Sequence, residues 1–104
     1  MRIYIAGKIT GEPDYKEKFA AAAERLRAEG HVPVNPCTVN GEGSRTYKEW
    51  IDAGLMKLMG CDAIYMLRDW KHSKGARLEH KYAHVTRMKI LKEEDNAPDP
   101  TKEA

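Results

Sequence analysis

The sequence has few of the features that would set it apart from ordinary globular proteins. Only two of its 104 residues are cysteines, Cys37 and Cys61, and their separation of 24 positions fits neither a disulfide framework nor a zinc motif. A long hydrophobic run is also missing, because Lys8 interrupts the apolar start at residues 3–6 too early for a signal peptide or a membrane span. These absences lead us to expect a cytoplasmic protein that does not insert into membranes.

An excess of one charge is also missing, since the formal net charge is only +2. So small an excess does not by itself indicate nucleic-acid binding. The charge is unevenly distributed: residues 71–92 carry seven Lys or Arg against one acid, Glu79, and residues 93–104 carry five acids and one lysine. We therefore expect an anion to bind at the basic segment and an acidic, flexible tail to follow residue 92.

The chain has the length and composition of one globular domain, with 41% hydrophobic and 33% charged residues, and we assign residues 1–92 to that domain. Apolar, β-branched runs predict strands at residues 2–6, 31–35 and 62–67, and a weak last strand at 88–91. Helical spacing of apolar residues predicts three helices between these strands. They begin at the capping residues Asp14, Thr46 and Ser73, the first two in capping-box patterns, and end near Gly30, Gly60 and Arg87.

Strict alternation of strand and helix predicts a parallel sheet with right-handed crossovers. The expected fold class is α/β: a small Rossmann-like or flavodoxin-like three-layer sandwich, with a central parallel sheet of about four strands and helices on both faces. Ligands of such sheets bind at the carboxyl ends of the strands. Residues 7–13, 35–45 and 68–79 are therefore the candidate site segments.

The segment after the first strand has two glycines, Gly7 and Gly11, where the backbone can pass close to a ligand. It matches neither G-x-G-x-x-G nor a Walker loop, so the standard dinucleotide and triphosphate motifs are excluded. A tight turn, with Tyr4 packed in the core, explains this segment equally well.

The segment around residue 73 is more specific. Ser73 and Gly75 stand at a predicted helix start, where free backbone N–H groups and the helix dipole favour a phosphate. Glu79 shares a helix face with Ala76 and Ala83, which places its carboxylate toward the sheet. The alternatives are a plain N-cap for Ser73 and a surface ion pair for Glu79. We expect Glu79 to stay ionised beside the helix start and the lysines, as a nucleophile that attacks a sugar must be.

Four segments together resemble the nucleoside 2-deoxyribosyltransferase-like family, over residues 1–91. The similarity is greatest to a small branch found in bacteria and phages, related to the 2'-deoxynucleoside 5'-monophosphate N-glycosidases. The segments are Tyr4-x-Ala6-Gly7-Lys8-x-Thr10-Gly11, Val34-Asn35-Pro36, Cys61-Asp62-Ala63-Ile64 and Trp70-x-x-Ser73-x-Gly75-Ala76-x-x-Glu79-x-x-x-Ala83.

The resemblance implies a role for several of these residues. Glu79 corresponds to the nucleophile, Tyr4 to the tyrosine that orients it, and Gly7 to a glycine beside the ligand. Ser73 stands where the monophosphate hydrolases bind the 5'-phosphate, whereas transferases that act on free nucleosides have an aspartate there. We expect Lys8, Ile9, Asn35, Pro36 and Gly75 to complete the substrate and phosphate contacts.

One position departs from the family pattern. The aspartate that protonates the departing base corresponds to Gly54 in this chain. Asp52 is the nearest acid and our candidate for that role, although two residues turn it about 200° around an ideal helix. Leaving-group protonation contributes about 10² to 10⁴ in rate, so binding is better supported than turnover.

The sequence therefore supports an N-glycosidase or deoxyribosyltransferase that acts on a nucleoside 5'-monophosphate and requires no cofactor. A non-catalytic nucleotide-binding module of the same fold is the alternative, and a nucleic-acid binder is the third. We expect a homo-oligomer, as in the relatives. His80 and His84 have the spacing of a metal pair but no third ligand, so we expect no metal. Trp50 and Trp70 are interpreted as a core residue and a loop lid.

Overall fold

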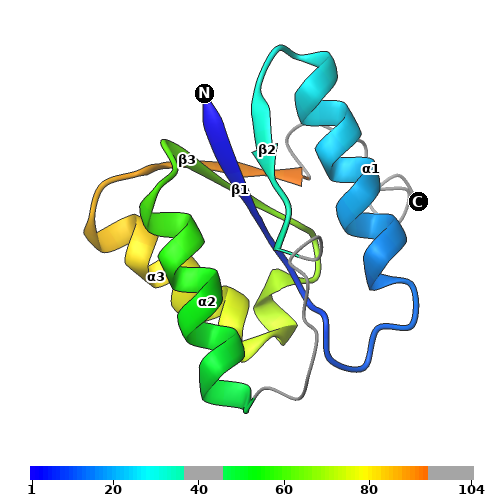
Figure 1. Cartoon of the computed structure of the whole chain (residues 1–104), viewed down its shortest axis with the longest axis vertical. Helices are drawn as coiled ribbons and strands as arrows, with labels where there is room; N and C mark the ends of the chain where they lie inside the picture. The colour runs from blue at the N-terminus through cyan, green and yellow to red at the C-terminus, as the bar shows by residue number, and fades with distance from the viewer. Residues whose placement is uncertain (37–45, 94–104) are drawn as a thin grey trace, which may run out of the picture.

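The computed structural model describes residues 1–36 and 46–93, which form a three-layer α/β sandwich (Figure 1). Its sheet consists of β1 (Arg2–Ala6), β2 (Val32–Val34), β3 (Ala63–Met66) and β4 (Lys89–Lys92). The strand order is β2-β1-β3-β4, and every neighbouring pair is parallel. The predicted fold class is confirmed.

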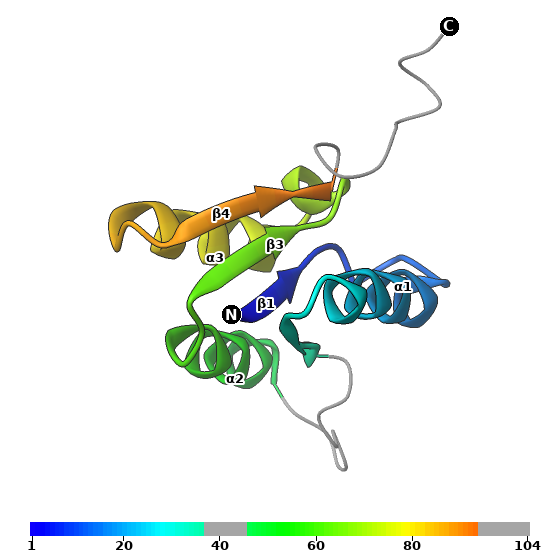
Figure 2. The same cartoon turned by 90° about the horizontal axis from the view of Figure 1, so that it is seen from above.

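Three helices connect the strands: α1 (Tyr15–Ala28), α2 (Tyr47–Met59) and α3 (Lys74–Val85). Helix α1 covers one face of the sheet, whereas α2 and α3 cover the other (Figure 2). The strands run toward one edge of the sheet and the helices return from it, so the carboxyl ends of β1 and β3 meet the starts of the helices there.

The central strand β1 divides its side chains between the two layers, as successive residues of a strand must. Ile3 and Ile5 pack with α1, in a cluster that includes Phe19 and Leu26. Tyr4 and Ala6 face α2 and α3 on the other side. Tyr4 is therefore a buried aromatic residue whose hydroxyl points into the layer that contains the charged helix α3.

The predicted capping residues were confirmed at two of the three helix starts. Thr46 caps α2 in a complete capping box with Glu49, and the Ser73 hydroxyl accepts a hydrogen bond from the backbone N–H of Ala76 at the start of α3. Asp14 precedes α1 as predicted, but its side chain makes no capping hydrogen bond. The expected capping box is wrong there, because Asp14 has a backbone ψ of 24° rather than the extended conformation of a capping residue.

Two further expectations are corrected. Trp70, interpreted from the sequence as a loop lid, lies in a short 3₁₀ helix, Trp70–His72, rather than in an irregular loop. Trp50 is not a core residue, since 45% of it is exposed on α2.

Within residues 1–36 and 46–93, no helix combines the length and the apolar character needed to cross a bilayer. The predicted tail at 93–104 lies outside the described residues except for Glu93.

Candidate active site

Tyr4 and Glu79 form a buried hydrogen-bonded pair between the sheet and α3. The Tyr4 hydroxyl donates to Oε2 of Glu79 over 2.6 Å. Glu79 lies on the face of α3 that also carries Ala76 and Ala83, as predicted, and it is the one charged residue buried in the described part of the chain. A buried carboxylate without a cationic partner is costly, which makes its presence a mark of function.

Burial raises the pKa of Glu79 to about 7, and the hydrogen bond from Tyr4 opposes this shift. The expectation that Glu79 stays fully ionised is therefore wrong. The helix start and the lysines do not compensate for the hydration that the carboxylate loses between α3 and the sheet. Near neutral pH the group is divided between its protonated and ionised forms, the range in which a catalytic carboxyl can change its charge.

Gly54 on α2 lies directly against this pair. A Cβ atom at Gly54 would lie 2.7 Å from Oε2 of Glu79 and 2.9 Å from the Tyr4 hydroxyl oxygen. Gly54 is buried and continues the helix, so the absence of a side chain is what leaves room for the pair. The position where the resemblance would place an acid therefore faces Glu79 directly.

The pair borders a cavity of about 790 Å³ at the carboxyl edge of the sheet. Eight of the ten residues predicted from the sequence as catalytic or binding groups line it. They are Tyr4, Gly7, Lys8, Ile9, Pro36, Ser73, Gly75 and Glu79. Residues far apart in the sequence thus meet in one space, which is large enough for a nucleotide.

The start of α3 forms one wall of the cavity. Its position is fixed by contacts with α2 and with the loop after β1. A Cβ atom at Gly75 would lie 2.9 Å from Cδ1 of Ile51, so the two helices touch there. The Asp69 carboxylate accepts a 3.0 Å hydrogen bond from the backbone N–H of Lys8, and Trp70 stacks on His80 with ring centroids 4.3 Å apart. These contacts hold Ser73 and Gly75 against the cavity that they line.

Two predicted residues do not reach the cavity. Asn35 is half-buried after β2 but is not among the lining residues, unlike its neighbour Pro36. Asp52 is exposed on α2 and pairs with Lys48 over 2.6 Å. Its proposed role as the acid is wrong, because α2 is regular at this point and turns Asp52 away from the face that contains Gly54.

Some lining residues were not predicted as catalytic or binding groups. On α2, Trp50, Ala53, Gly54 and Lys57 all face the cavity, at the spacing of one helix face. Since Gly54 was identified as a site position, the same spacing could have found Lys57 one turn further on. The loop at residues 8–10 and the start of α1 also contribute, and the remaining polar or aromatic lining side chains outside the predicted set are Thr10, Tyr15, Lys16, Phe19, Tyr47, His72 and Lys74.

The charges around the cavity favour an anionic ligand. Among its lining residues there are four lysines and one acid, Glu79. Within the described residues, no three His, Cys, Asp or Glu side chains come together in a group that could hold a metal ion. The arrangement can therefore bind a phosphate near the cationic wall and present a carboxylate to the part of the ligand that lies deeper.

Comparisons with known proteins agree with this fold. The model of a family described as "Domain of unknown function (DUF4406)" matches residues 1–92. A solved structure, "2-desoxiribosyltransferase from Leishmania mexicana", superposes with a TM-score of 0.67 at 21% sequence identity. The match covers 88% of this chain but 62% of that chain, so the two share the fold over a part of the larger protein. A search of the curated proteins gives no match.

Proposed function

The chain belongs to the family described as "Domain of unknown function (DUF4406)", and we propose that it cleaves the glycosidic bond of a nucleoside 5'-monophosphate. The observation that carries the proposal is the buried Tyr4–Glu79 pair at the edge of the cavity. Within the deoxyribosyltransferase-like fold, the proposed branch is the one related to the 2'-deoxynucleoside 5'-monophosphate N-glycosidases.

Glu79 acts as the nucleophile in this proposal. Its ionised carboxylate attacks the anomeric carbon, C1', and the bond from C1' to the base breaks as the new carbon–oxygen bond forms. Tyr4 keeps Oε2 of Glu79 in place by its 2.6 Å hydrogen bond, which leaves Oε1 as the attacking atom. Water then hydrolyses the glycosyl ester, or a second base accepts the sugar.

The phosphate of the substrate binds at the start of α3. Ser73 and Gly75 line the cavity there, with Lys74 beside them and Lys8 from the loop after β1. A phosphate at a helix start accepts hydrogen bonds from the free backbone N–H groups and is attracted by the positive end of the helix dipole. The Leishmania mexicana protein that shares this fold is a 2-deoxyribosyltransferase by name, which supports a nucleoside sugar as the ligand here.

The test is to incubate the purified protein with deoxynucleoside and ribonucleoside 5'-monophosphates and to follow the release of free base by chromatography. We expect release with the wild-type protein and none with Glu79→Gln, whose folding is checked by circular dichroism. Addition of a second base separates transfer from hydrolysis, because transfer gives a new nucleotide. Release that persists in Glu79→Gln would exclude the proposed role of Glu79.

A nucleotide-binding module without turnover is the second candidate. Gly54 favours it, because no acid stands at this position of α2 against Glu79 to protonate the departing base. Calorimetry distinguishes the two: the module binds a nucleoside 5'-monophosphate and returns it unchanged after prolonged incubation, whereas the enzyme converts it.

We also propose that the protein is a cytoplasmic homo-oligomer. Apolar side chains remain exposed on the outer sides of α2 and α3, among them Met56, Met59 and Val85, with 70%, 58% and 67% exposed. Contact between two copies would remove this surface from water. Sedimentation equilibrium of the purified chain tests the proposal, and a monomer at all concentrations would contradict it.

A further inference from the structure

Helices α2 and α3 run side by side along the cavity, and their contacts define successive levels. Near the start of α3, Gly75 meets Ile51 of α2; one turn further along both helices, Glu79 meets Gly54. Both residue numbers rise together, so the helices run in the same direction. Lys57 lies one further turn along α2, about 4.5 Å beyond Gly54 along the helix axis.

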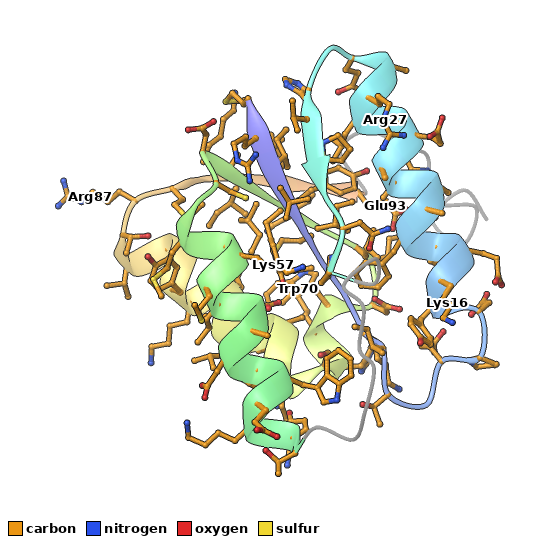
Figure 3. The ribbon with its side chains drawn as sticks, in the orientation of Figure 1. Lys16, Arg27, Lys57, Trp70, Arg87 and Glu93 are labelled. Atoms are coloured by element: carbon orange, nitrogen blue, oxygen red, sulfur yellow. The ribbon has the colours of Figure 1, made fainter. Side chains whose placement is uncertain are left out.

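Lys57 faces the same cavity as Gly54, because the two lie at i and i+3 on one side of α2. Figure 3 shows its side chain between α2 and the strands of the sheet. A helical side chain leans toward the N-terminal turn, so Lys57 extends back toward the level of Glu79. The ammonium group of this long side chain can therefore approach a ligand atom beside Glu79.

The surroundings of Lys57 leave its charge available to a ligand. The residue is half-buried, and within the described residues no carboxylate lies at ion-pair distance from it. The pKa of Glu12 is lowered mainly by its hydrogen bond from Lys18 and to a smaller extent by the charge of Lys8, so Lys8 already lies near a carboxylate. Lys57 is thus a cavity lysine with no ion pair among the described residues, one turn beyond Gly54 on the same face of α2.

If the proposed function holds, the order of these contacts along α2 and α3 determines on which side of Glu79 the base of a bound nucleotide lies. A nucleoside 5'-monophosphate has its sugar between the phosphate and the base. With the phosphate at Ser73 and C1' at Glu79, the base lies beyond Glu79 on the side of Lys57.

We propose that Lys57 contacts the departing base and replaces the acid that is absent from position 54. The Glu79 carboxylate forms a bond to C1', the bond from C1' to the base nitrogen breaks, and its electron pair stays on the base. The Lys57 ammonium group neutralises that charge and transfers a proton to the base, and water returns a proton to the resulting amine. The role is catalytic, since it is needed only as the bond breaks.

The test compares bases that must be protonated as they depart with a base that departs neutral. It rests on the proposed function. Lys57→Met and Lys57→Arg are assayed with dGMP, dUMP and 7-methyl-dGMP, whose base already carries a positive charge and departs neutral. We expect Lys57→Met to lower kcat for dGMP and dUMP by about 10²-fold or more, and to change kcat for 7-methyl-dGMP by less than about threefold. Lys57→Arg keeps the positive charge but cannot transfer a proton, so with dGMP and dUMP we expect its kcat to lie between those of Lys57→Met and the wild type.

Lys48→Met is the matched control, because Lys48 is an exposed lysine on the same helix that pairs with Asp52. We expect it to leave all three rates unchanged, and circular dichroism of each variant verifies its fold. An equal loss with all three substrates in Lys57→Met, or no loss at all, would overturn the role of Lys57 while leaving base release intact. If the wild-type protein released no base from any of the three, the proposed function and the role of Lys57 would fall together.

Discussion

Tyr4 and Glu79 lie 75 positions apart in the sequence and meet over a 2.6 Å hydrogen bond in the layer between β1 and α3. The bond partly offsets the loss of hydration that raises the pKa of Glu79 to about 7. Tyr4 therefore both orients the carboxylate and lowers the pH at which it ionises, against the larger effect of burial.

Replacement of Tyr4 by Phe should move the ionisation of Glu79 to higher pH. The carboxylate then loses its donor, and a hydrogen bond to a charged group contributes about 1.5 to 3 kcal/mol. The pH profile of base release should rise with pH in both proteins, with its midpoint near 7 in the wild type and higher in Tyr4→Phe, and the rate at pH 7 should fall about tenfold. An unchanged midpoint would show that Tyr4 does not act on Glu79.

Replacement of Gly54 by Ala should disrupt the same pair. The added Cβ atom meets Oε2 of Glu79 at 2.7 Å and the Tyr4 oxygen at 2.9 Å, distances at which one of them must move. Alanine in a helix interior normally adds up to about 1 kcal/mol of stability. We expect the opposite sign here, a loss of about 1 to 3 kcal/mol in urea unfolding, with loss of base release.

Gly60→Ala is the control for this substitution. Gly60 follows the last turn of α2 with a φ of −87°, and a Cβ atom there would meet no atom closer than 3.7 Å. The variant should keep its stability within about 0.5 kcal/mol of the wild type and retain activity. Equal losses in Gly54→Ala and Gly60→Ala would mean that contact with Glu79 is not the cause.

Glu79 should make the folding stability depend on pH. Its pKa is about 7 in the folded chain against an ordinary value of 4.5, so the folded state keeps a proton that the unfolded state loses between these values. The free energy of unfolding should thus fall by roughly 3 kcal/mol as the pH rises from 4.5 to 7, and this contribution should level off above 7. Urea unfolding of the wild type and of Glu79→Gln at several pH values checks this. The difference between the two proteins should show the slope, and a difference that is flat with pH would contradict it.

Ser73 should contribute to phosphate binding beyond its role as a helix cap. Its hydroxyl accepts a hydrogen bond from Ala76, and loss of such a cap costs about 1 kcal/mol. Thr46→Ala removes the corresponding cap from α2, outside the lining of the cavity, and serves as the control. Calorimetry should show weaker binding of a nucleoside 5'-monophosphate in Ser73→Ala only, with little change for the nucleoside. Equal effects on both ligands would remove Ser73 from the phosphate contacts.

The fold and most of the cavity could be predicted from the sequence because the signals there are local. Strands, helices and the inward face of α3 follow from the spacing of apolar residues, and Ala76 and Ala83 show that Glu79 points to the sheet. The ends of parallel strands share one edge, which brings the residues after β1 and β3 together. The pairing of Tyr4 with Glu79, by contrast, was predicted only from the resemblance to the nucleoside 2-deoxyribosyltransferase-like family.

Other features depend on packing that the sequence does not reveal. The pKa of Glu79 reflects how completely α2, α3 and the sheet exclude water, which the nearby lysines in the sequence did not indicate. Trp50 has the apolar character of a core residue, but it lies at the rim of the cavity rather than against the sheet. The capping pattern at Asp14 failed because the local backbone, rather than the residue type, decides whether a side chain can cap.

Covalent attack by Glu79 is the step on which the proposed function depends most. Rapid-quench intact-mass spectrometry of the protein mixed with a deoxynucleoside 5'-monophosphate measures this step directly. We predict a transient adduct that adds the mass of one deoxyribose 5-phosphate less one water, located on Glu79 by peptide mapping and absent from Glu79→Gln. Release of base at full rate with no adduct, or an adduct on another residue, would contradict covalent attack by Glu79.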